Sequence, residues 1–203
     1  MSYDILKDGR ERCQDCSATS VGTVKEFRTL YKRILNDMEA YYGININVPI
    51  TVRMVNTREL QRILKRKFKA TPQYDGRCVG VAIKSASGYT LVVENGSPKL
   101  NAMETISHEL THIWQYMNWD KAVLSQYKRE AELLLYEGMA EWASIQYMIL
   151  VGEEEYAKRQ EKLTLTRQDE YGIGFALYLK QYPLTWGQRI TKDTPFKLPR
   201  KPL

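Results

Sequence analysis

The two histidines of the chain lie four residues apart, in the sequence His108-Glu109-Leu-Thr-His112. Residues four apart project from the same face of a helix, so both imidazoles can bind one metal ion. Glu109 directly follows the first histidine and can reach a water molecule on that ion, as metal-assisted hydrolysis requires. The sequence therefore predicts a zinc site at His108 and His112, with Glu109 as the general base.

A third metal ligand is expected on a second apolar helix, from the sequence Glu137-Gly-Met-Ala-Glu141. These two glutamates share one helical face, and a carboxylate buried among apolar residues is costly unless it has a partner. Glu137 would complete a set of two histidines and one glutamate, with the fourth position left to water. Glu141 would then accept the free ring N–H of a ligand histidine. The alternative is a solvated pair of glutamates on an amphipathic helix.

Residues 137–140, Glu-Gly-Met-Ala, resemble the glutamate motif of gluzincin peptidases. The chain also resembles the DA1 family over nearly its whole length and in the family's order. Residues 49–56 and 171–175 resemble segments of its peptidase domain, and residues 8–16 resemble the end of the LIM-like zinc module that precedes this domain. The resemblance implies a zincin-like α+β fold, in which a small mixed sheet packs on the two ligand helices and the C-terminal half is mostly helical. Three departures stand out: Glu141 replaces a neutral residue of the plant members, only half of a LIM-like zinc site remains, and no ubiquitin-interacting segment is present, so ubiquitin-type regulation is not supported.

The resemblance also sets the expected domains. Residues 1–19 are similar to the end of a LIM-like zinc module, or serve as a linker, and residues 20–203 form the gluzincin-like peptidase domain. Cys13 and Cys16 make half of a tetrahedral zinc site, so a second, structural zinc requires two further ligands upstream. The alternative is a pair of free thiols. With Cys78 the cysteine count is odd, which argues against a disulfide framework.

Apolar periodicity and turn residues predict the elements that must position these side chains. The two ligand helices are expected around residues 101–117 and over 128–150. The other expected elements are a helix over 20–42, a strand over 49–55, a helix over 57–68 with Thr57 as its N-cap, a hairpin of strands 77–84 and 89–94, a helix over 153–165, a turn over 169–174, a helix to about 182, a last short helix from Pro183 and an extended tail from 191.

Composition restricts the class of protein. The 203 residues carry a net charge of +6, but the basic cluster at 62–69 is interleaved with apolar residues, so a nucleic-acid partner is not expected. No apolar run has the length of a membrane span, and the first residues lack a signal-peptide core. We therefore expect a cytoplasmic protein without a membrane partner.

These observations predict a zinc-dependent metallopeptidase that acts on proteins or peptides. With no histidine left, a tyrosine or an arginine must stabilise the oxyanion. Tyr171 is the candidate, because two glycines, Gly172 and Gly174, follow it closely and because it lies in a segment that resembles the DA1 family; the alternative is that it packs in the core. Two other functions stay open, a metal-stabilised interaction module without turnover and a regulator-cleaving peptidase of the ImmA type. A DNA-linked protease of the SprT kind needs a third histidine, which the chain lacks.

Overall fold

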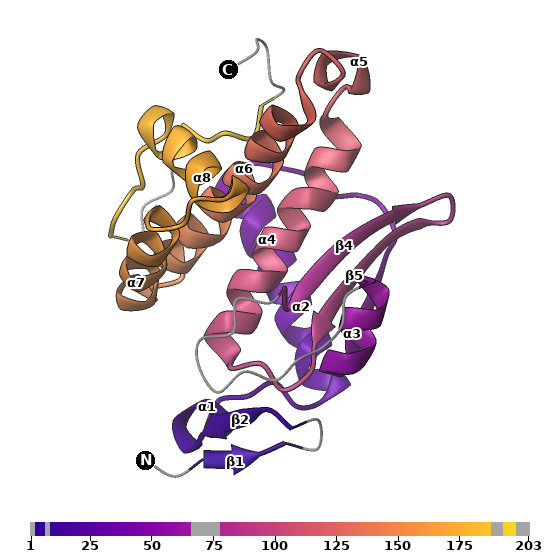
Figure 1. The fold of residues 1–203 in the computed structure, drawn as a ribbon, viewed down its shortest axis with the longest axis vertical. Coiled ribbons are helices and arrows are strands. Elements are labelled where there is room, and N and C mark those ends of the chain that lie inside the picture. Colours follow the sequence, from indigo (N-terminus) through magenta and orange to yellow (C-terminus); the bar gives the residue numbers. More distant parts are fainter. Residues whose placement is uncertain (1–2, 7–8, 66–77, 188–192, 198–203) are drawn as a thin grey trace. The chain divides into compact units, whose positions relative to one another are not determined.

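The computed structural model describes residues 3–6, 9–65, 78–187 and 193–197, which form an α+β fold with a small mixed sheet, as predicted. The chain divides into two compact units, residues 1–33 with 48–106 and residues 34–47 with 107–203. The expected boundary between residues 19 and 20 stays a prediction. The elements, labelled in Figure 1, are β1 (Tyr3–Ile5), β2 (Glu11–Cys13), α1 (Gln14–Ala18), α2 (Val24–Tyr42), β3 (Ile50–Val55), α3 (Thr57–Ile63), β4 (Gly80–Ser85), β5 (Gly88–Glu94), α4 (Lys99–Asn118), α5 (Lys121–Leu124), α6 (Arg129–Leu150), α7 (Glu154–Leu165) and α8 (Glu170–Gln181).

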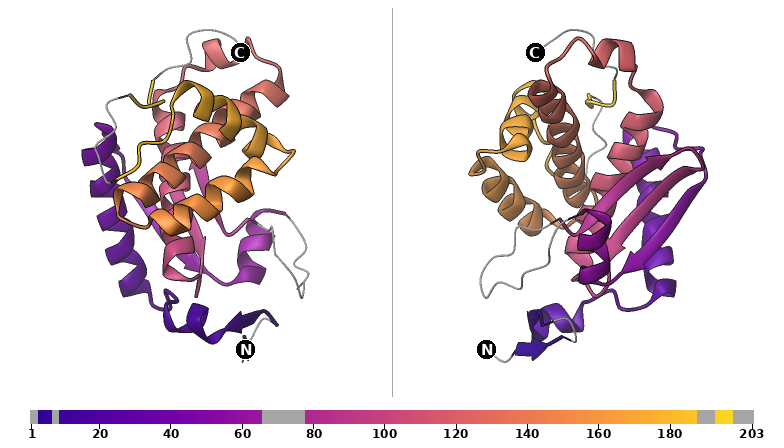
Figure 2. Two further views of the ribbon diagram at one scale, coloured as in Figure 1. Left: turned by 90° about the vertical axis from the view of Figure 1, so that its left-hand side faces the viewer. Right: turned by 45° about the vertical axis from the view of Figure 1, so that its right-hand side comes forward.

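The first unit contains a three-stranded sheet in the order β3-β5-β4. Strand β5 runs parallel to β3 and antiparallel to β4, with which it forms the predicted hairpin (Figure 2). Val55, Leu60 and Val92 are buried together, so the apolar side of α3 packs on this sheet. β-branched and aromatic residues make up four of the six residues of β3 and four of the seven of β5, which suits a pleated and half-buried surface.

Helix α3 differs from its prediction at both ends. Its N-cap is Asn56 rather than Thr57, since the Asn56 side chain accepts a hydrogen bond of 2.9 Å from the backbone N–H of Glu59. The Thr57 hydroxyl instead donates to the buried carboxylate of Glu94 at 2.5 Å. The helix ends at Ile63, and Lys65 has a φ of 54°, a left-handed conformation that does not continue a helix. The rest of the expected helix lies outside the described residues.

Periodicity did not predict the elements at the start of the chain. Strands β1 and β2 pair as a short antiparallel hairpin, and α1 follows directly. Arg10, in the loop between the strands, forms an ion pair with Glu94 at the end of β5. This contact joins the hairpin to the sheet of the first unit, although the hairpin itself has few apolar residues.

The second unit is helical, and α6 is its central element (Figures 1 and 2). Trp142 and Tyr147 of α6 are fully buried with Phe175 of α8. The Tyr147 hydroxyl donates to Asp37 of α2 at 3.0 Å. Buried hydroxyls need such partners, so this hydrogen bond fixes the C-terminal half of α2 beside α6.

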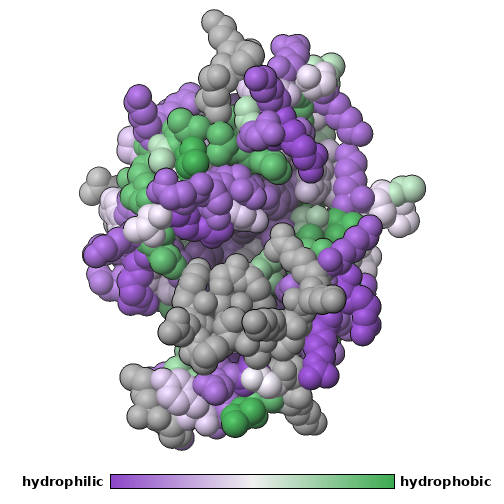
Figure 3. Space-filling model, viewed as in Figure 1, coloured by the Kyte–Doolittle hydropathy of each residue, from purple (hydrophilic) through white to green (hydrophobic). Residues whose placement is uncertain are grey.

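The turn expected over residues 169–174 is wrong, because these residues begin α8. Asp169 is the N-cap, and its side chain accepts a hydrogen bond from Gly172 N–H at 3.3 Å. Helix α8 has apolar residues on both sides: Phe175 is buried, whereas Ile173 and Leu177 are 44% and 39% exposed. The face drawn in Figure 3 shows hydrophobic surface among hydrophilic side chains. Without one polar face, the sequence of α8 has no clear helical period.

Gly138 and Gly174 allow helices α6 and α8 to approach each other closely. A Cβ atom on Gly138 of α6 would lie 2.2 Å from the backbone carbonyl carbon of Gly174, and one on Gly174 would lie 2.4 Å from the carbonyl oxygen of Leu134. Real Cβ atoms do not approach other atoms so closely, so both positions require glycine. The crossing sets the position of α8 relative to Glu137, the neighbour of Gly138 in sequence.

Gly138→Ala is expected to destabilise the protein by about 3 kcal/mol, at the upper end of the usual cost of overpacking, because backbone rather than a flexible side chain opposes the new methyl group. Urea unfolding followed by circular dichroism measures this change. Gly22→Ala is the control, since nothing lies within 4 Å of a Cβ atom at Gly22. Equal stability of the two variants would contradict the close crossing of α6 and α8.

The short helix expected from Pro183 is absent over residues 183–187. Side chains of α6 bind this stretch of backbone instead. The Gln146 side chain donates to the carbonyl of Thr185 at 2.9 Å and accepts from the backbone N–H of Thr185 at 2.7 Å. The Trp142 ring N–H donates to the carbonyl of Tyr182 at 2.6 Å. These bonds satisfy the backbone groups that a helix would have paired internally.

Among the described helices, none has both the length and the apolar character that a membrane crossing needs.

Candidate metal centre

Three side chains of the second unit meet at one point. His108 and His112 project from one face of α4, and Glu137 projects from α6. The Nε2 atoms of the histidines are 3.1 Å apart, and Oε2 of Glu137 lies 3.2 Å from the first and 3.3 Å from the second. Among the residues described, this is the one group of three or more potential ligand side chains placed to share an ion. The structure thus brings together the three predicted ligands.

The spacing of these atoms fits a metal ion. Tetrahedral zinc lies about 2.0–2.2 Å from nitrogen and oxygen ligands, so two of its ligand atoms are about 3.3–3.5 Å apart. The three observed separations are 3.1–3.3 Å, which an ion would need to widen only slightly. Two imidazoles and a carboxylate suit zinc and several other divalent metals. The buried cluster can therefore hold a metal ion, while its identity belongs to the proposal below.

Without a metal, the cluster is held by its own charges. Burial alone would lower the pKa of His108, but the hydrogen bond to Glu137 and the nearby carboxylates of Glu141 and Glu109 raise it from the ordinary 6.5 to about 9. Burial would raise the pKa of Glu137, yet its hydrogen bonds to His108 and His112 hold it well below its usual range. In the metal-free cluster, a protonated His108 thus supplies the positive charge that a metal ion would bring.

The affinity for zinc is therefore expected to rise about tenfold per pH unit between pH 7 and 8.5 and to level off near pH 9, because the metal must displace the His108 proton. In the metal-free protein, the raised pKa stabilises the fold fully below pH 6.5, and this contribution is lost as the pH rises through about 9. Competition with a chelator of known affinity, corrected for the chelator's own protonation, measures the slope. An affinity independent of pH over this range would show that His108 is neutral there.

Gln115 is a site residue that was not singled out from the sequence. Its side chain is fully buried, its Oε1 lies 2.8 Å from Nδ1 of His112, and its amide N–H donates to the carbonyl of Tyr136 at 3.0 Å. Since the amide oxygen can only accept, Nδ1 of His112 carries the proton and Nε2 keeps its lone pair for a metal. Gln115 thereby also links α4 to the residue before Glu137. Its position three residues after His112 was the available signal.

Gln115→Met is expected to weaken zinc binding by about 10- to 100-fold, because the methionine keeps the volume but no longer fixes the ring of His112. Zinc affinity is measured by chelator competition, with the melting temperature of the metal-free protein as a check on folding. Gln126→Met, at an exposed position after α5, is the matched control. An unchanged affinity in the Gln115 variant, with an intact fold, would remove this residue from the site.

Glu109, the predicted general base, lies beside the cluster. It is buried, with 6% of its surface exposed, and its charge acts on both His108 and Tyr116. Tyr116, the next residue on the face of His112, stacks on that histidine with ring centres 6.2 Å apart. Burial, followed by the charges of Glu109 and Glu137, raises the pKa of Tyr116 to about 12, so its phenol stays protonated. The helical spacing that revealed the histidines also leads to Tyr116, which was missed.

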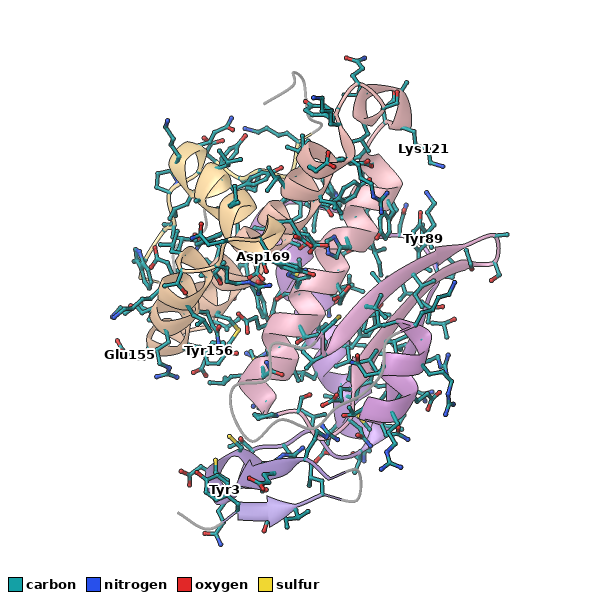
Figure 4. All side chains as sticks on the ribbon, in the orientation of Figure 1. Tyr3, Tyr89, Lys121, Glu155, Tyr156 and Asp169 are labelled. Atoms are coloured by element: carbon teal, nitrogen blue, oxygen red, sulfur yellow. The ribbon has the colours of Figure 1, made fainter. Side chains whose placement is uncertain are left out.

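Tyr171 stands next to the other histidine. Its ring stacks on that of His108 with centres 6.0 Å apart, and the guanidinium carbon of Arg167 lies 4.3 Å from the centre of the Tyr171 ring. Arg167 in turn is held by Asp169, the N-cap of α8 labelled in Figure 4, with N–O distances of 2.8–3.2 Å. The fold therefore places Tyr171 at the cluster, and its catalytic role stays a prediction.

Glu141 lies one turn beyond Glu137. Burial raises its pKa, against the charges of His108 and Arg167, which lower it. Its carboxylate is 4.0 Å from a guanidinium nitrogen of Arg167. Within the described part of the chain, no hydrogen bond joins it to a histidine ring, so its predicted hydrogen bond to a ligand stays a prediction.

Cys13 and Cys16, the predicted half of a structural zinc site, lie at the start of α1 in the first unit. The Sγ atom of Cys13 accepts a hydrogen bond from the Cys16 N–H at 3.4 Å, and both thiols are free and partly buried. The described residues bring no further histidine, cysteine or carboxylate into a group with them. A structural zinc here stays conditional on further ligands.

Comparison of the chain with protein-family models, with curated proteins and with solved structures finds no match. The interpretation of the metal centre therefore depends on its geometry and chemistry.

Proposed function

We propose that the protein is a zinc-dependent metallopeptidase that hydrolyses peptide bonds in protein or peptide substrates. One observation carries the proposal: His108, His112 and Glu137 converge from two helices, with a buried acid, Glu109, beside them. This set of ligands is that of gluzincin peptidases, and the sequence resembles the DA1 members of that group. The proposal includes a zincin-like arrangement of the fold.

His108, His112 and Glu137 would hold the zinc ion, which when bound would lower the pKa of a water ligand and polarise the carbonyl of the bond to be cleaved. Glu109 accepts the proton of the attacking water and passes it to the leaving amine. The hydrogen bond between Nδ1 of His112 and Oε1 of Gln115 orients this ring, so that its other nitrogen, Nε2, faces the metal position.

The oxyanion that develops during hydrolysis needs a hydrogen-bond donor. We assign this donor to Tyr171, whose ring stacks on His108 and is held by Arg167. Tyr116 is the second phenol at the cluster, and its raised pKa of about 12 keeps it a donor at neutral pH. Both rings stack on a ligand histidine, with ring centres 6.0 Å apart for Tyr171 and His108 and 6.2 Å apart for Tyr116 and His112.

Glu109 favours catalysis over a metal-stabilised module without turnover. A structural zinc site fills its fourth position with a protein ligand and has no use for a further acid. Glu109 is buried next to the cluster without being one of its three ligands. A base for an activated water explains its presence.

The test is the cleavage of a proteome-derived peptide library by the zinc-loaded protein, with new termini identified by mass spectrometry. Expected is a set of cleavages that disappears after the metal is removed by a chelator and returns when zinc is restored. A protein with one zinc per chain that cleaves nothing in the library, or whose cleavages survive metal removal, would contradict the proposal.

A further inference from the structure

The two sides of the metal centre differ in their chemistry. On one side, Tyr171 stacks on His108, and the guanidinium of Arg167 lies over the Tyr171 ring, so this side carries charge. On the other side, the neighbours of His112 are further aromatic rings. All of these residues belong to the second unit. We call the second side the aromatic flank, and it consists of Tyr116, Trp119 and Tyr136.

The rings of the aromatic flank contact one another and a metal ligand. The centre of the Tyr136 ring lies 4.8 Å from that of Trp119 and 5.9 Å from that of Tyr116. It lies 6.4 Å from the centre of the His112 ring, on which Tyr116 also stacks. Such separations are typical of stabilising aromatic pairs. A side chain bound against these rings would therefore lie next to the metal ligands, and so next to the bond that a metallopeptidase cleaves.

The backbone of the aromatic flank is fixed by Gln115. The backbone N–H of Trp119 donates to the carbonyl of Gln115 at 2.8 Å, and the Gln115 side-chain amide donates to the carbonyl of Tyr136 at 3.0 Å. The Oε1 atom of the same side chain lies 2.8 Å from Nδ1 of His112. One buried residue thus connects the flank to a metal ligand. A surface that is fixed before binding loses little entropy when a ligand binds to it.

Trp119 supports the ring of Tyr136 from the interior. Trp119 is only 6% exposed, and within the described ranges its ring N–H has no hydrogen-bond partner. Buried donors without an acceptor are costly and rare in folded proteins, so each of them needs an explanation. The ring contact with Tyr136 gives one, because it fixes the Trp119 ring in this orientation. The aromatic contact thus takes precedence over a hydrogen bond.

Tyr116 and Tyr136 present uncharged rings to a ligand. Both are partly exposed, in contrast to the buried Trp119. Burial raises the pKa of both phenols to about 12, and the charges of nearby carboxylates contribute. The rings therefore stay uncharged at neutral pH. Partly exposed aromatic rings beside a reactive centre are typical of sites that bind an apolar group.

We propose that the aromatic flank sets the specificity of the protein by binding an aromatic or large apolar side chain of the substrate, at one of the two positions beside the cleaved bond. The inference rests on the proposed peptidase function. A substrate ring would extend the ring contacts that the flank already makes. A carboxylate would be repelled by Glu109 and Glu137, whose charges act on Tyr116. On the other side of the centre, Arg167 already covers the ring of Tyr171.

The cleavage screen gives the first test. Aromatic and large apolar residues are expected at one position beside the cleaved bonds, with kcat/KM for a phenylalanine peptide about tenfold above that for the matching alanine peptide. Tyr136→Ser removes a ring of the flank and should abolish this ratio, whereas Tyr136→Phe removes only the hydroxyl and should keep it. Tyr156→Ser makes the same change on α7 (Figure 4) and should alter neither the ratio nor the activity.

Hydroxamate binding gives a second test, which needs no hydrolysis. Calorimetry of the zinc-loaded full chain compares N-acetylphenylalanine hydroxamate with N-acetylalanine hydroxamate. The wild type should bind the first about tenfold more tightly, and Tyr136→Ser should lose this preference. Circular dichroism checks that the variant is folded, and the comparison of the two probes on the wild type does not depend on it.

The two tests separate the inference from the proposed function. A preference between the hydroxamates without any peptide cleavage would contradict the proposed function and support the role of the flank. Equal binding of the two hydroxamates by the wild type, or an unchanged ratio in a folded Tyr136→Ser variant, would overturn the inference. Cleavage sites enriched in lysine and arginine instead would also overturn it, because carboxylates rather than rings would then select the substrate.

Discussion

Glu109→Gln is expected to lower kcat/KM for peptide hydrolysis by about 10²- to 10⁴-fold, the usual contribution of a general acid–base group. Glutamine keeps the size and the hydrogen-bonding oxygen of the side chain but accepts no proton from the attacking water. Because Glu109 is not among the three converging ligands, the variant should retain about one zinc per chain. Hydrolysis of a peptide found in the cleavage screen, together with metal analysis of the same sample, measures both quantities.

The control for this variant is Glu130→Gln, which makes the same chemical change at an exposed position of α6. It should match the wild type in activity and in zinc content. Full activity in the Glu109 variant would disprove the assigned mechanism. Loss of activity together with loss of zinc would show that Glu109 supports the metal rather than the attacking water.

The sequence could predict that His108 and His112 face the same point, because this depends only on their spacing along one helix. Two histidines four residues apart share a helical face in any amphipathic helix, and α4 forms over the expected residues. Glu137 lies 25 residues after His112 and is brought to the histidines only by the packing of α6 against α4, so no spacing rule could place it. What pointed to it in the sequence was a carboxylate on an otherwise apolar helix, which needs a partner. The structure then added Gln115 and Tyr116, whose spacing from His112 was equally regular.

The sequence was least informative where tertiary contacts decide the local structure. Two glycines made residues 169–174 look like a turn, although they allow α8 to cross α6 at close range. The hairpin of β1 and β2 has no apolar period and is joined to the sheet by the ion pair of Arg10 with Glu94. Contacts of this kind leave no periodic trace in a sequence.

Glu137→Ala is expected to weaken zinc binding by more than the 10- to 100-fold that loss of a supporting residue costs, because a ligand itself is removed. At neutral pH one effect opposes this loss. Without the Glu137 carboxylate, the pKa of His108 falls from about 9. A smaller fraction of the molecules then carries a proton on His108 that zinc must displace. Measurement of zinc affinity at pH 9 as well as pH 7.5 separates the two effects. The loss of affinity relative to the wild type should be larger at pH 9, because there the His108 proton weakens zinc binding by the wild type only slightly.

Glu130→Ala, two turns before Glu137 on the same helix and exposed to solvent, is the matched control and should bind zinc like the wild type. Circular dichroism of both metal-free variants shows whether α6 is intact, since removal of Glu137 also leaves a buried histidine without its acceptor. A folded Glu137 variant that binds one zinc with unchanged affinity would take the carboxylate out of the metal centre. The two histidines would then be a pair on a helix without a third ligand, and the proposed peptidase would lose its structural basis.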